Sequence, residues 1–466
     1  MPTQDRREAR PPAGTGRRGE ADRPRQGRRP GASETARLLA SVLLPNVARG
    51  VVLRRPLMTR LLTGLDADRR AVAALREMRE RHGDDPLPLS LAGRRAALVL
   101  SPQDVRRLLR ETPEPFSPGG REKNGALSHF EPHGVLVSDH ADRPRRRAAN
   151  EAALVPGQAI HPDGDTLAAQ ADEEALALAL ALHEDGGDLD WRRFTRSFGA
   201  MARRMVFGAF AADDHRTTEL LYRLRARANW AYAAPVRHKA RTEFLDRVRA
   251  NVERAEPGSL ARRLVAGAPA GGGRDTDPRP EDQAAHWLFA FDAAAVVAFR
   301  ALALLTSLSP GAYAAREEVD TREGLDLPLL RATVRESARL WPTTLVVIRE
   351  STRETSWREE VFGAGTAFLI VSSYFHRDSS RLPYADAFEP RIWLDGRAED
   401  EPGILPFSYG PAACAGIDVV PLAVSLFLRA LLRDRDLARV DAGGPLPASG
   451  LPASLNHFAL RFSLST

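Results

Sequence analysis

The chain's only cysteine stands among residue types that suit a metal ligand. Cys414 lies in the segment Phe407-Ser-Tyr-Gly410-Pro-Ala-Ala-Cys414-Ala-Gly416. Gly410 and Gly416 allow backbone N–H groups to approach the sulfur closely, and Phe407 offers an aromatic face on which a macrocycle can pack. A helix predicted from about residue 415 to 432 would point its positive end at the sulfur and favour the thiolate. These residues predict a metal-binding thiolate.

The competing interpretation is that the cysteine only fills space, which is the usual role of a lone cysteine. One cysteine excludes an internal disulfide and a cysteine-built zinc site, and it fits a reducing compartment. With 18 Phe and 35 Gly in the chain, chance would place Phe407, Gly410 and Gly416 around a given cysteine in about 2 of 10,000 cases. The spacing therefore favours the functional interpretation.

A second constellation precedes the cysteine. Glu336 and Arg339 lie three residues apart in a predicted helix that ends near Trp341-Pro342. A carboxylate and a guanidinium at this spacing share one helix face and can pair.

The motifs F-x-x-G-x-x-x-C-x-G and E-x-x-R, in this order, resemble the cytochrome P-450 superfamily of the soluble bacterial type, over about residues 50–466. The resemblance implies that Cys414 is the axial ligand of haem b (iron protoporphyrin IX), and that Glu336 and Arg339 form a structural pair that braces the cysteine loop. Residues 374–378 and 388–391 resemble the segment that precedes this loop in the family.

The resemblance also assigns cations to the haem propionates. Arg349 lies where the family places such a cation, and Arg143 and Arg147 match the propionate-binding helix that follows Ser138-Asp139-His140. Ala412 departs from the pattern, because a basic residue commonly stands there. Arg391 comes one residue earlier than usual, which puts its place in the Glu–Arg–Arg network in doubt.

The apolar segment 286–308 resembles the family's helix over the distal haem face. Asp292 keeps the usual acid, and Ala293 replaces the oxygen-activating threonine, so these two positions are the catalytic candidates. The expected substrate pocket contains Ala290, Phe291, Ala294, Val346 and Val347. Its walls are expected from residues 112–138, 225–240, 290–294 and 343–347.

The elements that must position these residues are mostly helical. Apolar spacing predicts helices at 66–82, 102–110, 140–153, 166–183, 190–208, 214–232 and 236–254, and a buried central helix within 286–308. A β-hairpin is predicted at 87–101, and strands at 344–349, 366–372 and 457–464. The fold class is mainly α with a minor β part: one large P-450-like domain over 36–466, after a disordered Arg/Pro/Gly-rich tail over 1–35.

Composition narrows the class of protein further. Hydrophobic content of 43% and charged content of 27% are ordinary for a soluble globular protein. All but two of the 67 basic residues are arginine and the net charge is only +6, which does not indicate a nucleic-acid partner. No export signal or membrane span is expected, so the predicted location is cytoplasmic.

The predicted function is a monooxygenase that inserts oxygen from O2 into an apolar, oxygenated small molecule. Electrons are expected from a ferredoxin and an NAD(P)H-dependent ferredoxin reductase, with the chain acting as a monomer. Ala293 motivates an alternative with peroxide-driven oxidation, C–C coupling or isomerisation. Two further alternatives are a hydrolase that uses Cys414 as nucleophile with His376, and a catalytically silent haem binder.

Overall fold

The computed structural model describes residues 29–91, 93–138, 141–267 and 278–465 of the chain. Most of the predicted tail, residues 1–28, therefore lies outside the described residues, as do Asp139 and His140. Helix α1 (Ala32–Leu38) begins inside the last part of the predicted tail. Its Glu34 carboxylate pairs with Arg81 at 3.1 Å, so the folded part starts before the predicted boundary at residue 36.

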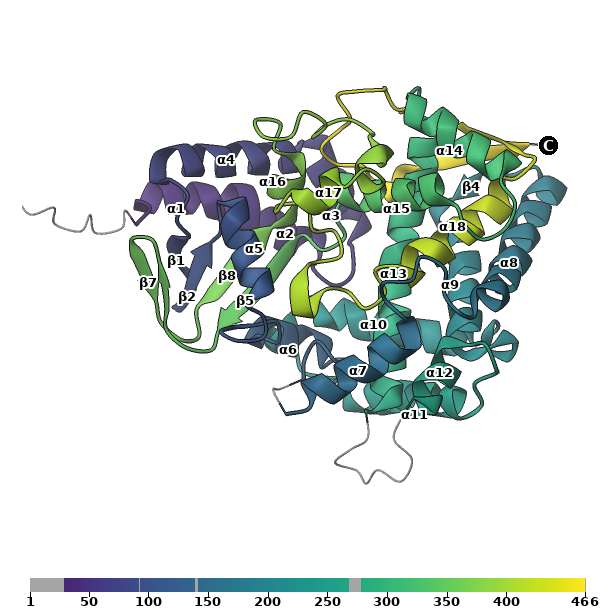
Figure 1. The fold of residues 1–466 in the computed structure, drawn as a ribbon, viewed down its shortest axis with the longest axis horizontal. Coiled ribbons are helices and arrows are strands. Elements are labelled where there is room, and N and C mark those ends of the chain that lie inside the picture. The colour runs from purple at the N-terminus through teal and green to yellow at the C-terminus, as the bar shows by residue number, and fades with distance from the viewer. Residues whose placement is uncertain (1–28, 92, 139–140, 268–277, 466) are drawn as a thin grey trace, which may run out of the picture.

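Helices make up most of the described chain (Figure 1). After α1 they are α2 (Leu44–Arg49), α3 (Pro56–Gly64), α4 (Ala67–His82), α5 (Pro102–Arg110), α6 (Arg121–Leu127), α7 (Arg143–Leu154), α8 (Gly164–Asp185), α9 (Trp191–Phe207), α10 (His215–Ala228), α11 (His238–Glu253), α12 (Leu260–Ala266), α13 (Pro280–Leu305), α14 (Pro310–Thr321), α15 (Pro328–Leu340), α16 (Ser372–Arg377), α17 (Arg397–Asp400) and α18 (Val419–Leu432).

The β part is small and divided among three sheets. A five-stranded sheet has the order β1-β2-β8-β5-β3, a second sheet has the order β4-β10-β9, and β6 pairs with β7. The strands are β1 (Leu87–Leu91), β2 (Arg94–Leu98), β3 (Phe116–Ser117), β4 (Leu189–Asp190), β5 (Val346–Ser351), β6 (Thr355–Trp357), β7 (Glu360–Phe362), β8 (Ala367–Val371), β9 (Asp436–Arg439) and β10 (Arg461–Ser465).

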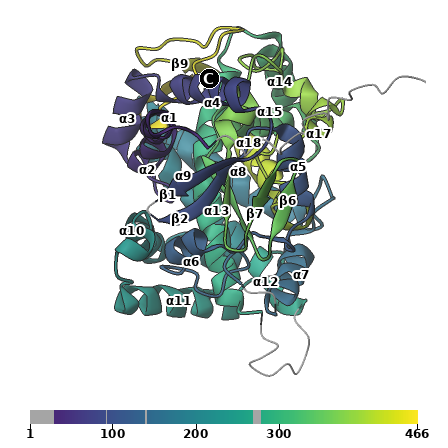
Figure 2. The ribbon, with the colours of Figure 1, turned by 90° about the vertical axis from the view of Figure 1, so that its left-hand side faces the viewer.

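The described residues form two hydrophobic cores, one against the five-stranded sheet and one among the helices. The smaller core joins the apolar face of α4, including Leu75 and Met78, to the five-stranded sheet, including Phe368. The larger core lies among the helices around α13. Figure 2 shows the β1–β2 hairpin beside α4, with α10 and α11 at the other end of the molecule. The fold is thus mainly α with a minor β part, as predicted.

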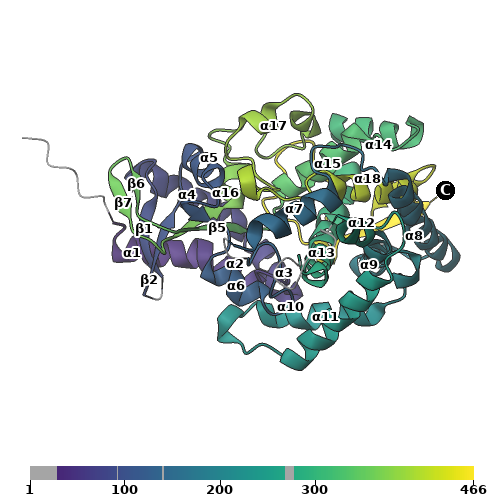
Figure 3. The ribbon, with the colours of Figure 1, turned by 60° about the horizontal axis from the view of Figure 1, so that its bottom comes forward.

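Helix α13 is the central element of the fold (Figures 1 and 3). Pro280 at its first turn and the acidic pair Glu281 and Asp282 suit a helix N-terminus. It packs against α9, α11, α15 and α18. By length and hydropathy it could cross a membrane, but 78% of its most apolar window is buried inside the protein. Ala, Leu and Val on all its faces therefore serve the core of the molecule.

Several predicted boundaries differ from the structure. The helix after the cysteine begins at Val419 and not near residue 415, because residues 415–418 form a turn. The predicted strand at 457–464 starts with a 3₁₀ turn, His457–Ala459, before β10. The helix predicted at 214–232 ends at Ala228, and a 3₁₀ turn follows at Ala231–Ala233. Each difference lies at the end of an element, where apolar periodicity gives the weakest signal.

Candidate functional site

A cavity of about 1500 Å³ lies between the cysteine loop and the middle of α13. Cys414, Phe407 and Gly416 line it from the loop. The predicted pocket residues also line it: Ala290, Phe291, Asp292, Ala293 and Ala294 from α13, and Val346 and Val347 from β5. Parts of the predicted walls 112–138, 225–240 and 343–347 contribute as well. The sequence therefore located both the loop and the walls of one cavity.

The cysteine loop is held by close backbone contacts. Gly410 has φ +69°, and a Cβ built on it would lie 2.4 Å from the Leu109 carbonyl oxygen in α5, so only glycine fits there. The Cys414 N–H donates to the Phe407 carbonyl oxygen at 2.8 Å, which closes the loop on itself. A Cβ at Gly416 would lie 3.7 Å from the Cys414 sulfur. Gly416 thus lies beside the sulfur as expected, whereas Gly410 makes room for the backbone of α5 and not for an N–H group at the sulfur.

The thiol itself is surrounded differently from the prediction. Burial raises the pKa of Cys414, and Asp418 raises it further, while the Gly416 N–H and the Arg147 charge lower it. The α18 N-terminus is separated from Cys414 by the turn at 415–418, so the predicted help from a helix starting at the sulfur is wrong. The Gly416 N–H and the Arg147 charge are the groups that favour the thiolate form of Cys414. A cation bound at the sulfur would shift the group toward the thiolate.

The cations predicted for the propionates gather beside the loop. Arg349 in β5 is buried and donates to the Thr112 and Ser408 hydroxyls at 3.1 and 3.2 Å. Arg147 in α7 pairs with Glu151 at 2.6 Å and donates to the Ala413 carbonyl oxygen of the cysteine loop. Arg349 and Arg147 line the cavity.

Arg143 differs from the other two arginines. It is buried, it donates to the Val135 carbonyl oxygen at 2.9 Å, and it is not among the described residues that line the cavity. Burial first, and then the neighbouring Arg147 charge, lowers the pKa of Arg143 to about 10. Burial and the Arg143 charge likewise lower the pKa of Arg349 to about 10. No described carboxylate pairs with Arg143 or Arg349.

Lys123 in α6 adds a cation that the sequence analysis missed. It lines the same cavity, and no hydrogen bond or ion pair links its ammonium group to another described residue. Burial, and then the charges of Arg349 and Arg143, lower the pKa of Lys123 well below its usual value. Three uncompensated cations thus lie close together, an arrangement that needs an anion to be stable.

On α13, Asp292 has a partner that the sequence did not reveal. Its carboxylate forms an ion pair with Arg225 of α10, and both side chains line the cavity. Asp292 is 41% exposed, whereas Arg225 is 7% exposed and also stacks over the Phe289 ring, 5.1 Å from its centroid. Burial, and then the Arg54 charge, lower the pKa of Arg225 to about 9. Ala293, the next residue, brings no polar side-chain atom to this position.

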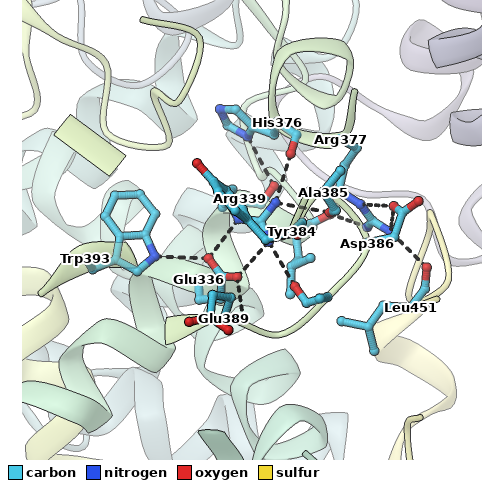
Figure 4. A network of polar contacts seen from close by, with 12 residues as sticks. Glu336, Arg339, His376, Arg377, Tyr384, Ala385, Asp386, Glu389, Trp393 and Leu451 are labelled. Atoms are coloured by element: carbon cyan, nitrogen blue, oxygen red, sulfur yellow. Dashed lines mark hydrogen bonds and ion pairs between the residues drawn. The ribbon is translucent and has the colours of Figure 1, made fainter. Parts of the chain in front are cut away.

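The predicted pair in α15 forms the centre of a buried network (Figure 4). Glu336 and Arg339 are fully buried and meet through two hydrogen bonds of 2.6 and 2.7 Å. The carboxylate also accepts from the Glu389 N–H and the Trp393 indole N–H, each at 3.0 Å. The guanidinium donates to backbone carbonyl oxygens of the segment that leads to the cysteine loop: His376, Tyr384, Ala385 and Ala387.

Arg391 takes no part in this network. Its side chain is exposed, and no hydrogen bond joins it to Glu336 among the described residues. Arg391, which lies one residue earlier than the family pattern, is therefore not the second arginine of a Glu–Arg–Arg network in this structure. The Trp393 indole and the Glu389 backbone supply the remaining donors to the Glu336 carboxylate.

His376 is a structural histidine and not a catalytic partner of the cysteine. Its Nε2 accepts from the Leu405 N–H at 3.1 Å, and its Nδ1 lies 3.1 Å from the Arg339 carbonyl oxygen. Burial, and then the Arg339 charge, lower the pKa of His376 to about 3. Both ring nitrogens are therefore occupied by backbone groups, which removes the basis for a Cys414–His376 hydrolase.

Three further cavity residues were not singled out from the sequence, although one of them, Arg225, begins the predicted wall 225–240. Arg54, Arg225 and His457 all line the cavity, yet they come from three segments far apart in the chain. Arginine is so frequent in this sequence that a single arginine does not indicate a functional position. Lys123 could have been noticed, since it is one of only two lysines in the chain.

Comparison with known proteins agrees with this geometry. The family model described as Cytochrome P450 matches residues 313–452. The mouse mitochondrial sterol 26-hydroxylase is 33% identical over 121 residues, which is 24% of this chain and 22% of that protein. A cyclooctat-9-en-7-ol 5-monooxygenase of Streptomyces melanosporofaciens is 33% identical over 115 residues, 24% of this chain and 25% of that protein. The matches thus span about a quarter of these relatives.

The solved structures extend the similarity to most of the chain. A zebra fish cytochrome P450, determined with abiraterone, has a TM-score of 0.64 and 17% identity, and covers 84% of this chain and 98% of its own. A six-coordinated cytochrome P450 from Thermus thermophilus has a TM-score of 0.62 and 20% identity, and covers 85% of this chain and 98% of its own. These structures establish the fold.

The single cysteine on the cavity, the glycine-supported loop and the buried Glu336–Arg339 network form the kind of site that a haem-thiolate protein needs. The chain matches the Cytochrome P450 family model over residues 313–452 and has the fold of solved cytochrome P450 structures. Haem b is the cofactor of that family. The residues present fit it, because a thiol lines a large cavity with apolar walls, and uncompensated cations at one side of the loop can receive two propionates.

Proposed function

We propose that this chain is a haem-thiolate monooxygenase that inserts oxygen from O2 into an apolar, oxygenated small molecule. The observation that carries the proposal is that the only cysteine lines the same cavity as the acidic residue of the central helix, Asp292. The printed names of the relatives, a hydroxylase and a monooxygenase, support this class of reaction. Their substrates are not carried over, since the matches cover only a quarter of each relative.

Each part of the site then has a role. Cys414 would hold the haem iron, and Phe407, Gly410 and Gly416 would shape the loop around its sulfur. Arg349, Arg147 and Lys123 would bind propionates, with Arg143 supporting them from its buried position. Haem bound through a thiolate supplies the redox chemistry that activates dioxygen. The chain's own contribution on the distal side is to hold the Asp292 carboxylate at the cavity through Arg225 and to exclude bulk water with the apolar walls.

The proposal includes the partners. Electrons would come from a ferredoxin and its NAD(P)H-dependent reductase, and the chain would act as a cytoplasmic monomer. Reconstitution with a ferredoxin system, measured as substrate-dependent NAD(P)H oxidation, tests this part.

The spectrum of the reduced, carbon-monoxide-treated protein tests the central assignment. Wild type is expected to show the strongly red-shifted Soret band that thiolate ligation produces. Cys414→Ser should lose that band, even if haem stays bound, because a serine hydroxyl does not supply the same ligand charge. Retention of the band by the serine variant would show that Cys414 is not the ligand.

A second candidate is peroxide-driven or non-hydroxylating chemistry, which Ala293 and the Arg225–Asp292 pair favour. With no hydroxyl at 293 and the Asp292 carboxylate held by Arg225, protons for oxygen activation depend on water or on a polar group of the substrate. General acid–base assistance is worth about 10²–10⁴-fold. Asp292→Asn should therefore slow O2-dependent turnover far more than turnover with added peroxide, and Ala293→Thr should improve coupling on a substrate without a polar group. Equal loss in both assays would contradict the role of Asp292.

A further inference from the structure

One wall of the cavity carries polar groups that the proposed oxygen chemistry does not use. We define this cationic wall as Arg54 and Arg225 together with the imidazole of His457, whose lowered pKa keeps it neutral. All three line the cavity. They come from the segment before α3, from α10 and from the 3₁₀ turn before β10. The Arg225 guanidinium donates to the carbonyl oxygen of Val52 at 3.0 Å, so it lies against the segment that carries Arg54. Burial first, and then the charges of Arg300 and Arg54, lower the pKa of His457.

The positive charge of this wall exceeds its negative charge. Arg225 is paired with Asp292. Arg54 donates only to the backbone carbonyl oxygens of Gly50 and Thr343, and no described carboxylate forms an ion pair with it. Among the described residues that line this side of the cavity, one guanidinium is therefore left without a counter-charge.

The nearest acid outside the wall is already engaged. Asp68 lies near Arg54, but it pairs with Arg49 at 3.0 Å and accepts from the Ser454 hydroxyl. Arg300 adds another cation nearby, held only by carbonyl oxygens of residues 341 and 455. The surroundings therefore strengthen the excess of positive charge on the wall.

The wall also has polar atoms without partners. The Arg225 Nε and both ring nitrogens of His457 form no hydrogen bond with a described residue, although the two side chains are buried. The His457 ring packs edge-on against Trp191, 4.5 Å between centroids. A buried polar atom without a partner costs about 1–3 kcal/mol, so the Arg225 Nε–H and the single N–H of the neutral His457 ring call for a ligand with acceptor oxygens.

The chain leading up to Arg54 adds an apolar surface to the cavity. Arg54 lies in the loop between α2 and α3, and a π-helical turn at Leu39–Leu43 precedes α2. The apolar side chains of this part of the chain that line the cavity are Leu39, Leu43, Val47, Val51, Val52 and Leu53. A ligand that fits both features has one anionic group on an apolar body.

We propose that the cationic wall binds the carboxylate of an otherwise apolar monocarboxylic acid, and that this acid is the substrate. One carboxylate neutralises Arg54, the guanidinium of the wall that has no counter-charge among the described residues. The carboxylate would also compete with Asp292 for Arg225, so substrate binding would release Asp292 beside Ala293, where a proton carrier is missing. This inference rests on the proposed function, because it names the substrate class of that same cavity.

Paired ligands test the proposal on the full, haem-loaded chain. The probes are dodecanoate, abietate and lithocholate, each compared with the corresponding primary alcohol and methyl ester at pH 8. Dissociation constants are read from the Soret shift and, independently of the haem spectrum, from the thermal shift. At least one acid should bind about 10–100-fold more tightly than its alcohol, the range expected for a charge-assisted hydrogen-bonded pair. Equal binding in every pair, or no binding of the acids, overturns the proposal.

Variants separate anion binding from general damage. Arg54→Gln should remove the preference for acid over alcohol, while Arg192→Gln, which changes an exposed arginine on the same cavity, should keep it. Asp292→Asn removes the competitor for Arg225, so it should tighten acid binding by about 10-fold and leave alcohol binding unchanged. A merely structural Asp292–Arg225 pair predicts equal or weaker binding of both, which would contradict the exchange.

The two levels of the proposal fail in different ways. If the reduced carbon monoxide spectrum lacks the thiolate band, the proposed function fails, and the thermal shift still reports whether the wall binds carboxylates. If the thiolate band is present and acids show no preference, only the substrate class is wrong.

Discussion

At the scale of single residues, the positive charge that the family usually places in the cysteine loop comes here from another element. Ala412 has no charge to offer a propionate, and Lys123 brings one from a different element, α6. A lysine suits this position because its ammonium group is a compact point charge on a flexible stem. In the proposed haem site, Lys123 would supply a positive charge that the cysteine loop lacks at Ala412.

Lys123→Met is predicted to weaken haem retention without unfolding the protein. Its methionine would keep the apolar stem and lose the charge, and one hydrogen bond to a charged group is worth about 1.5–3 kcal/mol. The rate of haem transfer to apomyoglobin should therefore rise about 10–100-fold. The control is Lys239→Met, which changes the only other lysine, exposed in α11. Identical transfer rates for the two variants would exclude Lys123 from the propionate site.

At the scale of elements, α15 connects the central helix to the segment that carries the cysteine. The Ser337 hydroxyl donates to the Val297 carbonyl oxygen of α13 at 2.9 Å, and Arg339 on the same helix donates to the carbonyl oxygens before the loop. The helix thus fixes the distance between the two sides of the cavity. These hydrogen bonds are how α15 could brace the cysteine loop, the role that the resemblance implied for Glu336 and Arg339.

Removal of Arg339 is predicted to be severe for this reason. Arg339→Ala leaves the Glu336 carboxylate buried with only two donors, at a cost of about 3–5 kcal/mol. Purified protein should contain little haem, and its urea midpoint should fall. The matched control is Arg69→Ala, which breaks an exposed pair with Asp66 at 2.6 Å and the same three-residue spacing, and should cost at most about 0.5 kcal/mol. Normal haem loading of the Arg339 variant would show that the network is not required.

The histidine on α16 is predicted to make the fold sensitive to acid. The pKa of His376 in the folded chain is about 3, below the value of about 6.5 for an unfolded histidine. Between these values the unfolded chain binds the extra proton, so stability falls as pH falls, by up to about 1.4 kcal/mol per pH unit from this group. His376→Gln keeps a donor and an acceptor but cannot titrate. Its free energy of unfolding should therefore depend less steeply on pH from 6 to 4 than that of wild type; equal slopes would contradict this role.

At the scale of the whole molecule, the sequence predicted those features that residues close together in the chain determine. Helices such as α4 and α13, the hairpin β1–β2 and the pair Glu336–Arg339 follow from periodicity and spacing, and the structure contains them. Contacts between distant segments could not be predicted in this way. Arg225 is 67 residues from Asp292; the resemblance placed both segments on the pocket wall, but no local pattern indicates that this guanidinium pairs with this carboxylate.

The last prediction concerns where the folded molecule begins. Leu38 and Val42 are buried in the smaller core, and each is expected to contribute about 1.5–3 kcal/mol. Deletion of residues 1–43 should therefore reduce the free energy of unfolding by about 3–6 kcal/mol. It should also change ligand binding, because Leu39 and Leu43 line the cavity. Deletion of residues 1–30 stops before α1 and removes a segment with almost no apolar side chains, so haem content and the urea midpoint should stay as in the full chain.

The double variant Leu38→Ala, Val42→Ala in the full chain separates lost packing from lost length, and it should reproduce most of the longer deletion's effect. Loss of stability on removing only residues 1–30 would mean that this segment packs on the domain, contrary to the composition. An unaffected longer deletion would mean that α1 contributes nothing to the core, in conflict with the burial of Leu38 and with the Glu34–Arg81 ion pair that ties α1 to α4.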